Sequence, residues 1–153
     1  MKTKLNMKRA VLWSTILIVI QMVLGNLLYM NPIVAGINKQ FEGHPSIKSF
    51  DFIGGLGNWI ILTMVFGIIE MIFWIFLYNL LYNSLPGKNW VKGLSFGLII
   101  GFIKSVPEAF NQWMVINYPV PLILVQLFNT YLSIIIFGIL LGFIFYKFKI
   151  IEE

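Results

Sequence analysis

The chain has 153 residues, of which 59% are hydrophobic and only 11% are charged, and its formal net charge is +5. A typical soluble domain has about 45–50% apolar and about 25% charged residues, so this composition excludes an ordinary soluble protein. Cysteine is absent and His44 is the single histidine, which excludes a disulfide framework and a zinc or haem site built from these side chains. We therefore expect neither a metal nor a cofactor.

Four apolar segments are long enough to cross a bilayer, because about 20 helical residues span a hydrocarbon core of ~30 Å. They cover residues 10–30, 57–82, 91–116 and 120–146 and take up most of the chain. The first follows a basic start, as a secretory signal does, but its apolar stretch exceeds the 7–15 residues of a signal core, so we expect it to be retained. The sequence predicts an all-α integral membrane protein with a single domain over 1–153, folded as an antiparallel bundle of four transmembrane helices.

The connections between these segments differ in length. Residues 31–56 form one long loop, which mixes glycine, proline and charged residues with an apolar run at 33–37; we expect an interfacial or re-entrant segment there. The turns at 83–88 and 117–121 are short. Because short turns join antiparallel neighbours, the second span should pack beside the third, and the third beside the fourth.

Basic residues are distributed unevenly over the connections. If the chain starts in the cytoplasm, the inner flanks carry eight Lys and Arg residues, and the outer loop carries only Lys39 and Lys48. The eight are Lys2, Lys4, Lys8, Arg9, Lys88, Lys92, Lys147 and Lys149. By the positive-inside rule, both termini are predicted to be cytoplasmic in a multi-pass protein of the cell membrane. The net charge then anchors the chain to the lipid bilayer, and we expect no nucleic-acid partner.

Three ionisable residues lie inside the apolar segments. Glu70 in the second span and Lys104 in the third lie at similar depth near the bilayer midplane, and Glu108 follows Lys104 by one helical turn. A lone charge at the centre of a membrane helix costs roughly 2.5–3.5 kcal/mol by insertion scales, so such residues pair, face a wet cavity or perform a function. We expect an ion pair between Glu70 and Lys104, which leaves one carboxylate in excess.

The third span has one polar face on a helical wheel, opposite an arc of bulky apolar residues. Polar residues also occur in the outer half of the fourth span. Together with this face, they predict a polar cavity that opens to the outside and is closed on the inner side by apolar residues. The candidate ligand- or ion-binding residues are Glu70, Lys104, Glu108, Asn111, Gln112 and Asn129. The alternative is a hydrogen-bonded network that only fixes how the helices pack.

Small residues recur at every fourth position in the third and fourth spans. They are Gly93, Gly97, Gly101 and Ser105 in the third, and Gly138 and Gly142 in the fourth. Such ladders allow two membrane helices to approach closely, so we predict that the five glycines are helix-packing residues. Pro107 interrupts the backbone hydrogen bonds of the third span between Lys104 and Glu108.

A further sequence pattern extends over the second half of the chain. It combines Leu85-Pro86-Gly87 in the inner turn, Lys92-Gly93 and Gly97 opening the third span, Pro107 in mid-span and the ending 138–146. Over roughly the last 75 residues, the chain thereby resembles uncharacterised small four-span membrane proteins of bacteria and archaea. The resemblance implies a membrane protein of about this size, and it implies no activity or catalytic residue.

These observations favour a small polytopic membrane protein that binds or conducts a small solute or ion at a midplane site, as a transporter or channel would. Four spans enclose little volume, so we expect self-association as a homo-oligomer or assembly with another membrane protein. The alternative function is a non-catalytic accessory subunit whose buried charges are structural or dock a partner. An enzyme is the least favoured class, because the spans hold no histidine and no carboxylate pair with metal ligands.

Overall fold

A computed structural model of the chain describes residues 4–148 and 150–152. For a few of these it describes the backbone alone: Lys4, Leu5, Met7, Ser14, Asn26, Ile151 and Glu152. The helices are α1 (Met7–Tyr29), α2 (Pro32–Gln40), the 3₁₀ helix η1 (Phe50–Ile53), α3 (Leu56–Leu81), α4 (Trp90–Met114) and α5 (Val120–Lys147). Two strands of two residues each, β1 (Lys4–Leu5) and β2 (Ile151–Glu152), pair antiparallel near the chain ends.

Four helices are long and apolar enough to cross a membrane, namely α1, α3, α4 and α5. The mean hydropathy of their most apolar windows is 2.1, 2.5, 1.3 and 2.2, respectively. The all-helical class and the four candidate spans are therefore confirmed. The helix ends differ from the predicted ends by at most three residues, the largest difference being at the start of α1.

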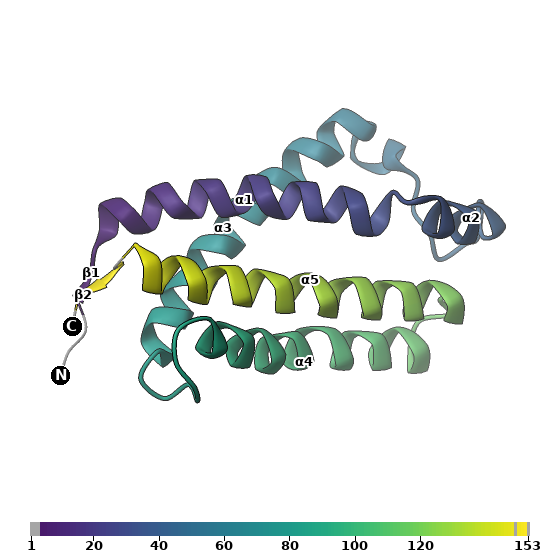
Figure 1. Ribbon diagram of the computed structural model, residues 1–153. Coiled ribbons are helices and arrows are strands. Elements are labelled where there is room, and N and C mark those ends of the chain that lie inside the picture. Colours follow the sequence, from purple (N-terminus) through teal and green to yellow (C-terminus); the bar gives the residue numbers. More distant parts are fainter. Residues whose placement is uncertain (1–3, 149, 153) are drawn as a thin grey trace.

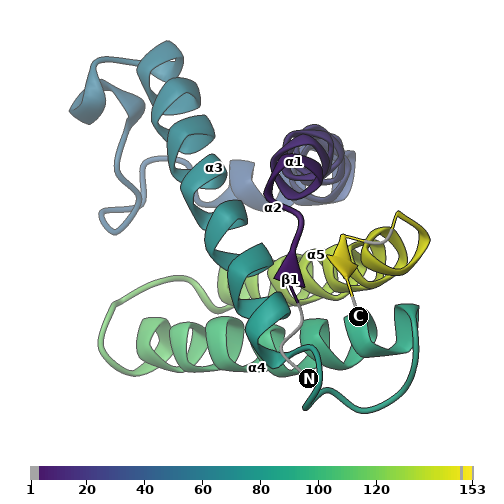
Figure 2. The same cartoon turned by 90° about the vertical axis from the view of Figure 1, so that its left-hand side faces the viewer.

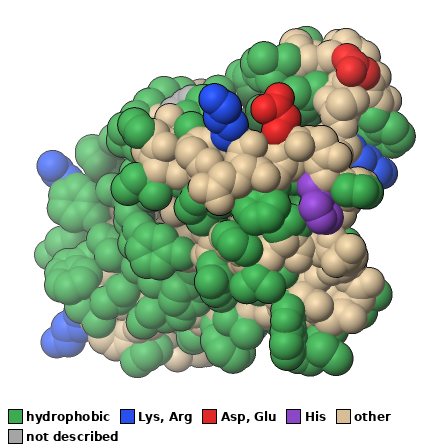
Figure 3. All heavy atoms as spheres, turned by 90° about the vertical axis from the view of Figure 1, so that its right-hand side faces the viewer, with side chains coloured by type: hydrophobic (Ala, Val, Ile, Leu, Met, Phe, Trp, Pro, Cys, Tyr) green, Lys and Arg blue, Asp and Glu red, His purple; other side chains and the backbone are tan. Residues whose placement is uncertain are grey.

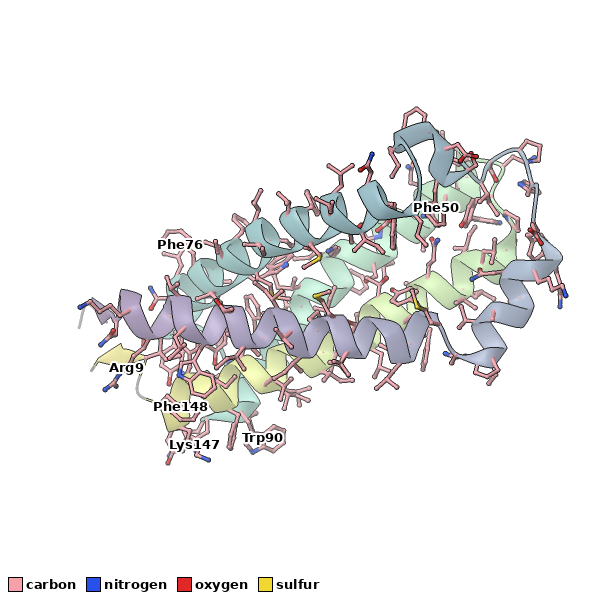
Figure 4. The ribbon with its side chains drawn as sticks, turned by 90° about the horizontal axis from the view of Figure 1, so that it is seen from above. Arg9, Phe50, Phe76, Trp90, Lys147 and Phe148 are labelled. Atoms are coloured by element: carbon pink, nitrogen blue, oxygen red, sulfur yellow. The ribbon has the colours of Figure 1, made fainter. Side chains whose placement is uncertain are left out.

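The helix α5 lies between α1 and α4, and these three helices form one side of the molecule (Figure 1). The chain ends and the α3–α4 turn lie at one end of the molecule, which we name the terminal end. The helix α2 and the α4–α5 turn lie at the opposite end, which we name the α2 end. Figure 4 shows the same division, with Arg9, Lys147 and Phe148 at the terminal end and Phe50 at the other.

The closest helix contact joins α4 to α5 through glycine. A Cβ added to Gly93 would lie 2.8 Å from the Cα of Gly142, and closer still to the carbonyl oxygen of Gly138. One added to Gly97 would lie 2.9 Å from the Cα of Ile135. These neighbours are backbone atoms, so only glycine fits. Since Gly93 meets Gly138 and Gly142 whereas Gly97 meets an earlier residue of α5, the two helices run in opposite directions.

The apolar core lies toward the terminal end. Tyr78 of α3 is fully buried, and its ring packs edge-on against Phe96 of α4 and Phe145 of α5, with centroids 5.2 and 4.9 Å apart. Trp74 of α3 adds a second edge contact to Phe96. Aromatic rings from three helices thus hold one end of the molecule together.

The helix α3 does not pack along the whole of α4, although the six-residue turn predicted that it would. It touches α4 near the turn and diverges from it toward its own N-terminus (Figures 1 and 2), so that nearly every residue from 56 to 69 is exposed. The reason lies in the faces available: α5 occupies the glycine face of α4, and α3 meets α4 through the large rings of Trp74 and Tyr78. Such side chains hold the helix axes apart.

The long loop contains more structure than its composition indicates. Asn31 caps α2, because its Oδ1 accepts hydrogen bonds from the backbone N–H groups of Ile33 and Val34 at 3.1 and 3.0 Å. Gly54 and Gly55, with φ of 83° and 98°, provide the turn between η1 and α3. Figure 3, which faces the α2 end, shows apolar side chains over much of this surface too.

Candidate functional site

The ion pair expected between the second and third spans is present. Lys104 Nζ of α4 donates to Glu70 Oε1 of α3, with the two side chains 36% and 25% exposed, respectively. Lys104 Nζ also lies 5.9 Å from the ring centroid of Trp74. The pair bridges the region where α3 diverges from α4.

Glu108 lies one turn further along α4, beyond Pro107. Its carboxylate is exposed, and the hydrogen bond found for it is a long one of 3.4 Å from Gln112 Nε2 on the same helix. No Lys, Arg or His side chain that the structure describes forms an ion pair with it. Glu108 therefore carries the excess negative charge that the sequence predicted for this layer.

A cavity of about 300 Å³ lies between α1, α4 and α5. Polar side chains form most of its wall, with Ala109, Ile123 and Leu127 filling the remainder. The polar residues are Tyr29 of α1, Ser105, Glu108 and Gln112 of α4, and Gln126 and Thr130 of α5. All of them lie in the half of their helix that is nearer the α2 end.

Hydrogen bonds fix part of this wall. The hydroxyls of Tyr29 and Thr130 lie 2.7 Å apart and share a hydrogen bond between α1 and α5. Gln126 Nε2 donates to the hydroxyl of Tyr118 at 3.0 Å. Two sides of the cavity are thus held in place by contacts between elements.

The hydroxyl of Ser105 is an exception. Its side chain is 2% exposed, and the Oγ atom has no hydrogen-bond partner. A buried hydroxyl without a partner costs free energy, commonly 1–3 kcal/mol in proteins, and such a group is rare in folded structures. Because Ser105 lines the cavity, a molecule bound there could supply the missing hydrogen bond.

A second polar layer joins α1 to α5 outside the cavity wall. Asn129 Nδ2 donates to the carbonyl oxygen of Leu28 at 2.7 Å, and Gln21 Nε2 donates to Ser133 Oγ. Asn129 and Ser133 are both buried. These side chains are satisfied by each other and by backbone, and they fasten the two helices.

The six candidate residues do not form a single site. Glu108 and Gln112 line the cavity, whereas Glu70 and Lys104 pair between α3 and α4. Asn129 donates its side-chain hydrogen bond to the backbone of α1, and Asn111 is exposed outside the cavity wall. The side chain of Asn26 in α1 lies outside the described residues.

Four polar cavity residues were absent from our candidates: Tyr29, Ser105, Gln126 and Thr130. Ser105 lies on the polar arc of the third span, so its position was visible in the sequence. Tyr29 ends the first span and Thr130 lies in the outer half of the fourth. Their similar depth in the membrane was the sequence feature that could have placed them together.

The cavity has no continuation between α4 and α5 toward the terminal end. One turn beyond Ser105, a Cβ on Gly101 would come within 2.8 Å of the Tyr131 ring, and Gly97 then contacts the backbone of α5. Backbone contact of this kind leaves no passage along the interface.

Comparisons with known protein families, with curated proteins and with solved structures find no match to this chain. Within the described residues there is also no group of three or more His, Cys, Asp or Glu side chains that could hold a metal ion. The geometry therefore defines the class: an all-helical protein with four helices that could span a membrane and a polar cavity between three of them.

Proposed function

We propose that the chain is an integral protein of the cell membrane whose α1, α3, α4 and α5 span the bilayer as an antiparallel bundle. The length and hydropathy of these helices support it. So does their surface, because large apolar side chains such as Val19, Phe66 and Phe102 are more than half exposed. Apolar surface of this extent favours lipid over water as the surrounding medium. We also propose that the chain resembles the small four-span membrane proteins of bacteria and archaea.

The orientation we propose places the terminal end in the cytoplasm. Lys8, Arg9, Lys88 and Lys147 belong to segments at that end, as the positive-inside rule requires for a cytoplasmic face. The α2 end is then outside. The cavity lies in the outer half of the membrane under this assignment.

The function we propose is binding of a small polar solute or ion in the cavity. The observation that carries it is the Glu108 carboxylate, which lines a cavity of about 300 Å³ and has no cationic partner among the described residues. Inside a membrane, an uncompensated carboxylate is maintained where it performs a function. A network that only fixed helix packing would satisfy Glu108 as it satisfies Asn129.

Conduction through a single copy is not part of this proposal. The glycine contact leaves no passage between α4 and α5 on the inner side of the cavity, so transport along this interface would require the helices to rearrange. The proposed oligomer, with a second copy or another membrane protein, would supply an interface for such a rearrangement.

One observation favours the alternative function of an accessory subunit. The side chains of the Glu70–Lys104 pair are 25% and 36% exposed, respectively, and the pair lies where α3 leaves α4. A polar residue on a partner membrane protein could complete the hydrogen bonds of this pair. In that case Glu70 and Lys104 would be the docking residues, and the cavity at Glu108 would have no ligand.

Purified protein in lipid nanodiscs can be screened against small cations, anions and neutral solutes by thermal unfolding. We expect at least one solute class to raise the melting temperature, and Glu108→Gln to abolish that rise. The matched control is Glu42→Gln, the same chemical change at an exposed loop residue outside the cavity wall. Equal responses of wild type and Glu108→Gln, or no response to any class, would exclude the cavity as a binding site.

A further inference from the structure

We infer that the cavity selects a small monovalent organic cation with N–H donors, that is, a protonated primary amine. This inference rests on the proposed function of the cavity and adds the chemical class of the ligand. Three properties of the wall lead to it: its charge, its size and its free hydrogen-bonding groups.

The charge of the site is that of one carboxylate. Lys104 is bound to Glu70, so this pair is neutral overall, and Glu108 contributes a single uncompensated negative charge. The other residues that line the cavity are neutral. A divalent metal would need further acidic or histidine ligands, and the described residues hold no such group. An anion would be repelled, which leaves a monovalent cation as the charge-matched ligand.

The size of the cavity favours an organic cation over a bare ion. A water molecule occupies about 30 Å³ of liquid volume, so about 300 Å³ is far more than a dehydrated alkali ion fills. Cavities near this volume are at the lower end of the range that holds small organic ligands. A molecule of a few heavy atoms fits the space, and Ala109, Ile123 and Leu127 would contact its carbon atoms.

The free groups of the wall are mainly hydrogen-bond acceptors. Glu108 offers two carboxylate oxygens, of which one receives only the long bond from Gln112. The buried Ser105 hydroxyl has no partner and can accept a hydrogen bond. An ammonium group presents three donors and no acceptor, as in lysine. It would neutralise Glu108 and satisfy Ser105 at once.

A quaternary ammonium ion matches the same charge but not the same wall. It has no N–H donor, and proteins recognise it by surrounding it with aromatic rings. Tyr29 is the single aromatic residue in the described cavity wall, and its hydroxyl is bonded to Thr130. The acceptor-rich wall therefore favours the primary amine over its trimethylated counterpart.

The test compares four probes that share a hydroxyalkyl group and differ in the second group: ethanolammonium, choline, ethylene glycol and glycolate. Each is titrated into the nanodisc-embedded protein at constant ionic strength and neutral pH, and an apparent Kd is obtained from calorimetry. We expect ethanolammonium to bind at least tenfold more tightly than each of the others. Glu108→Gln should abolish its binding, and Glu42→Gln should leave it unchanged.

Ser105→Ala gives a second, independent readout. Loss of a hydroxyl that has no partner in the empty cavity should leave the unliganded melting temperature equal or higher, whereas the apparent Kd for ethanolammonium should rise several-fold. A lower melting temperature without a change in Kd would show that Ser105 is only structural and would overturn its role as an acceptor.

The outcomes separate the ligand class from the function. If choline, ethylene glycol or glycolate binds as tightly as ethanolammonium and still requires Glu108, the amine inference is wrong and the cavity remains a binding site. If ethanolammonium binds equally well to Glu108→Gln, the carboxylate is not the anchor and the inference fails. If none of the four probes binds while another solute class stabilises the protein through Glu108, the inference alone is overturned.

Discussion

At the scale of single residues, the three ionisable side chains predicted within the spans divide into an ion pair and one unpaired carboxylate. Lys104 and Glu70 come from different helices and neutralise each other, whereas Glu108, only four residues from Lys104, faces a cavity. The sequence predicted the pair, because depth in the membrane can be counted along two spans joined by a short turn. The predicted pair also left Glu108 as the carboxylate in excess, but the sequence could not predict the shape of the cavity that Glu108 faces, since that depends on how α1, α4 and α5 pack.

We predict that Lys104→Met destabilises the protein by about 1–3 kcal/mol, because it leaves the Glu70 carboxylate without its partner. A fully buried pair would lose more, and the partial exposure of both side chains lowers the estimate. Glu70→Gln combined with Lys104→Met should recover part of the loss. Thermal unfolding of the two single variants and the double variant in detergent forms the cycle that measures this coupling.

If Glu70 and Lys104 interact, the double variant should lose less stability than the two single variants lose together. Strictly additive effects would mean that Glu70 and Lys104 do not interact in the folded protein, whatever their separation.

At the scale of the helices, the α4–α5 pair is the best-packed part of the molecule, and glycine is the reason. The four-residue spacing of Gly93, Gly97 and Gly101 predicted a close approach, and α5 presents Gly138 and Gly142 at the matching height. The spacing along one helix shows which of its faces carries small residues. A close approach also requires small residues at the same depth on the partner helix. For α3 no such match exists: it meets α4 through the rings of Trp74 and Tyr78 and through the Glu70–Lys104 pair, and the crossing angle could not be predicted from these residue types.

We predict that Gly97→Ala destabilises the protein by about 1–3 kcal/mol, because the added methyl group would lie 2.9 Å from backbone atoms of α5. The matched control is Gly67→Ala in α3, where a Cβ would meet nothing within 4 Å. There the same substitution should be neutral or stabilise by up to about 1 kcal/mol, as alanine favours helix. Thermal unfolding in one detergent compares the two variants. Similar effects at both positions would contradict close packing at Gly97.

At the scale of the whole molecule, hydropathy alone was enough to find the four long helices, because a span requires about 20 apolar residues whatever its neighbours are. The cavity could not be predicted in the same way. Its wall draws residues from α1, α4 and α5 that are separated by up to about a hundred positions, and only the packing of the helices brings Tyr29 to Thr130.

We predict that the terminal end faces the cytoplasm. The chain has no cysteine, so Ser49→Cys in the long loop and Ser84→Cys in the α3–α4 turn each create a unique thiol at an exposed position. A membrane-impermeant maleimide added to intact cells should label position 49 and spare position 84 until the membrane is opened. The reverse pattern would invert the proposed topology.

The strand pairing beside the membrane helices has one further consequence. Lys4 and Leu5 pair with Glu152 and Ile151, and Arg9 Nη1 donates to the carbonyl oxygen of Phe148 at 3.0 Å, so residues from the two extremes of the sequence are neighbours in space. A short linker could close this gap, and the chain could then be opened in the exposed turn between Asn83 and Ser84. Such a circular permutant would keep every long helix intact and both new ends on the original side. In this permutant the helices would be synthesised in a different order but would form the same contacts.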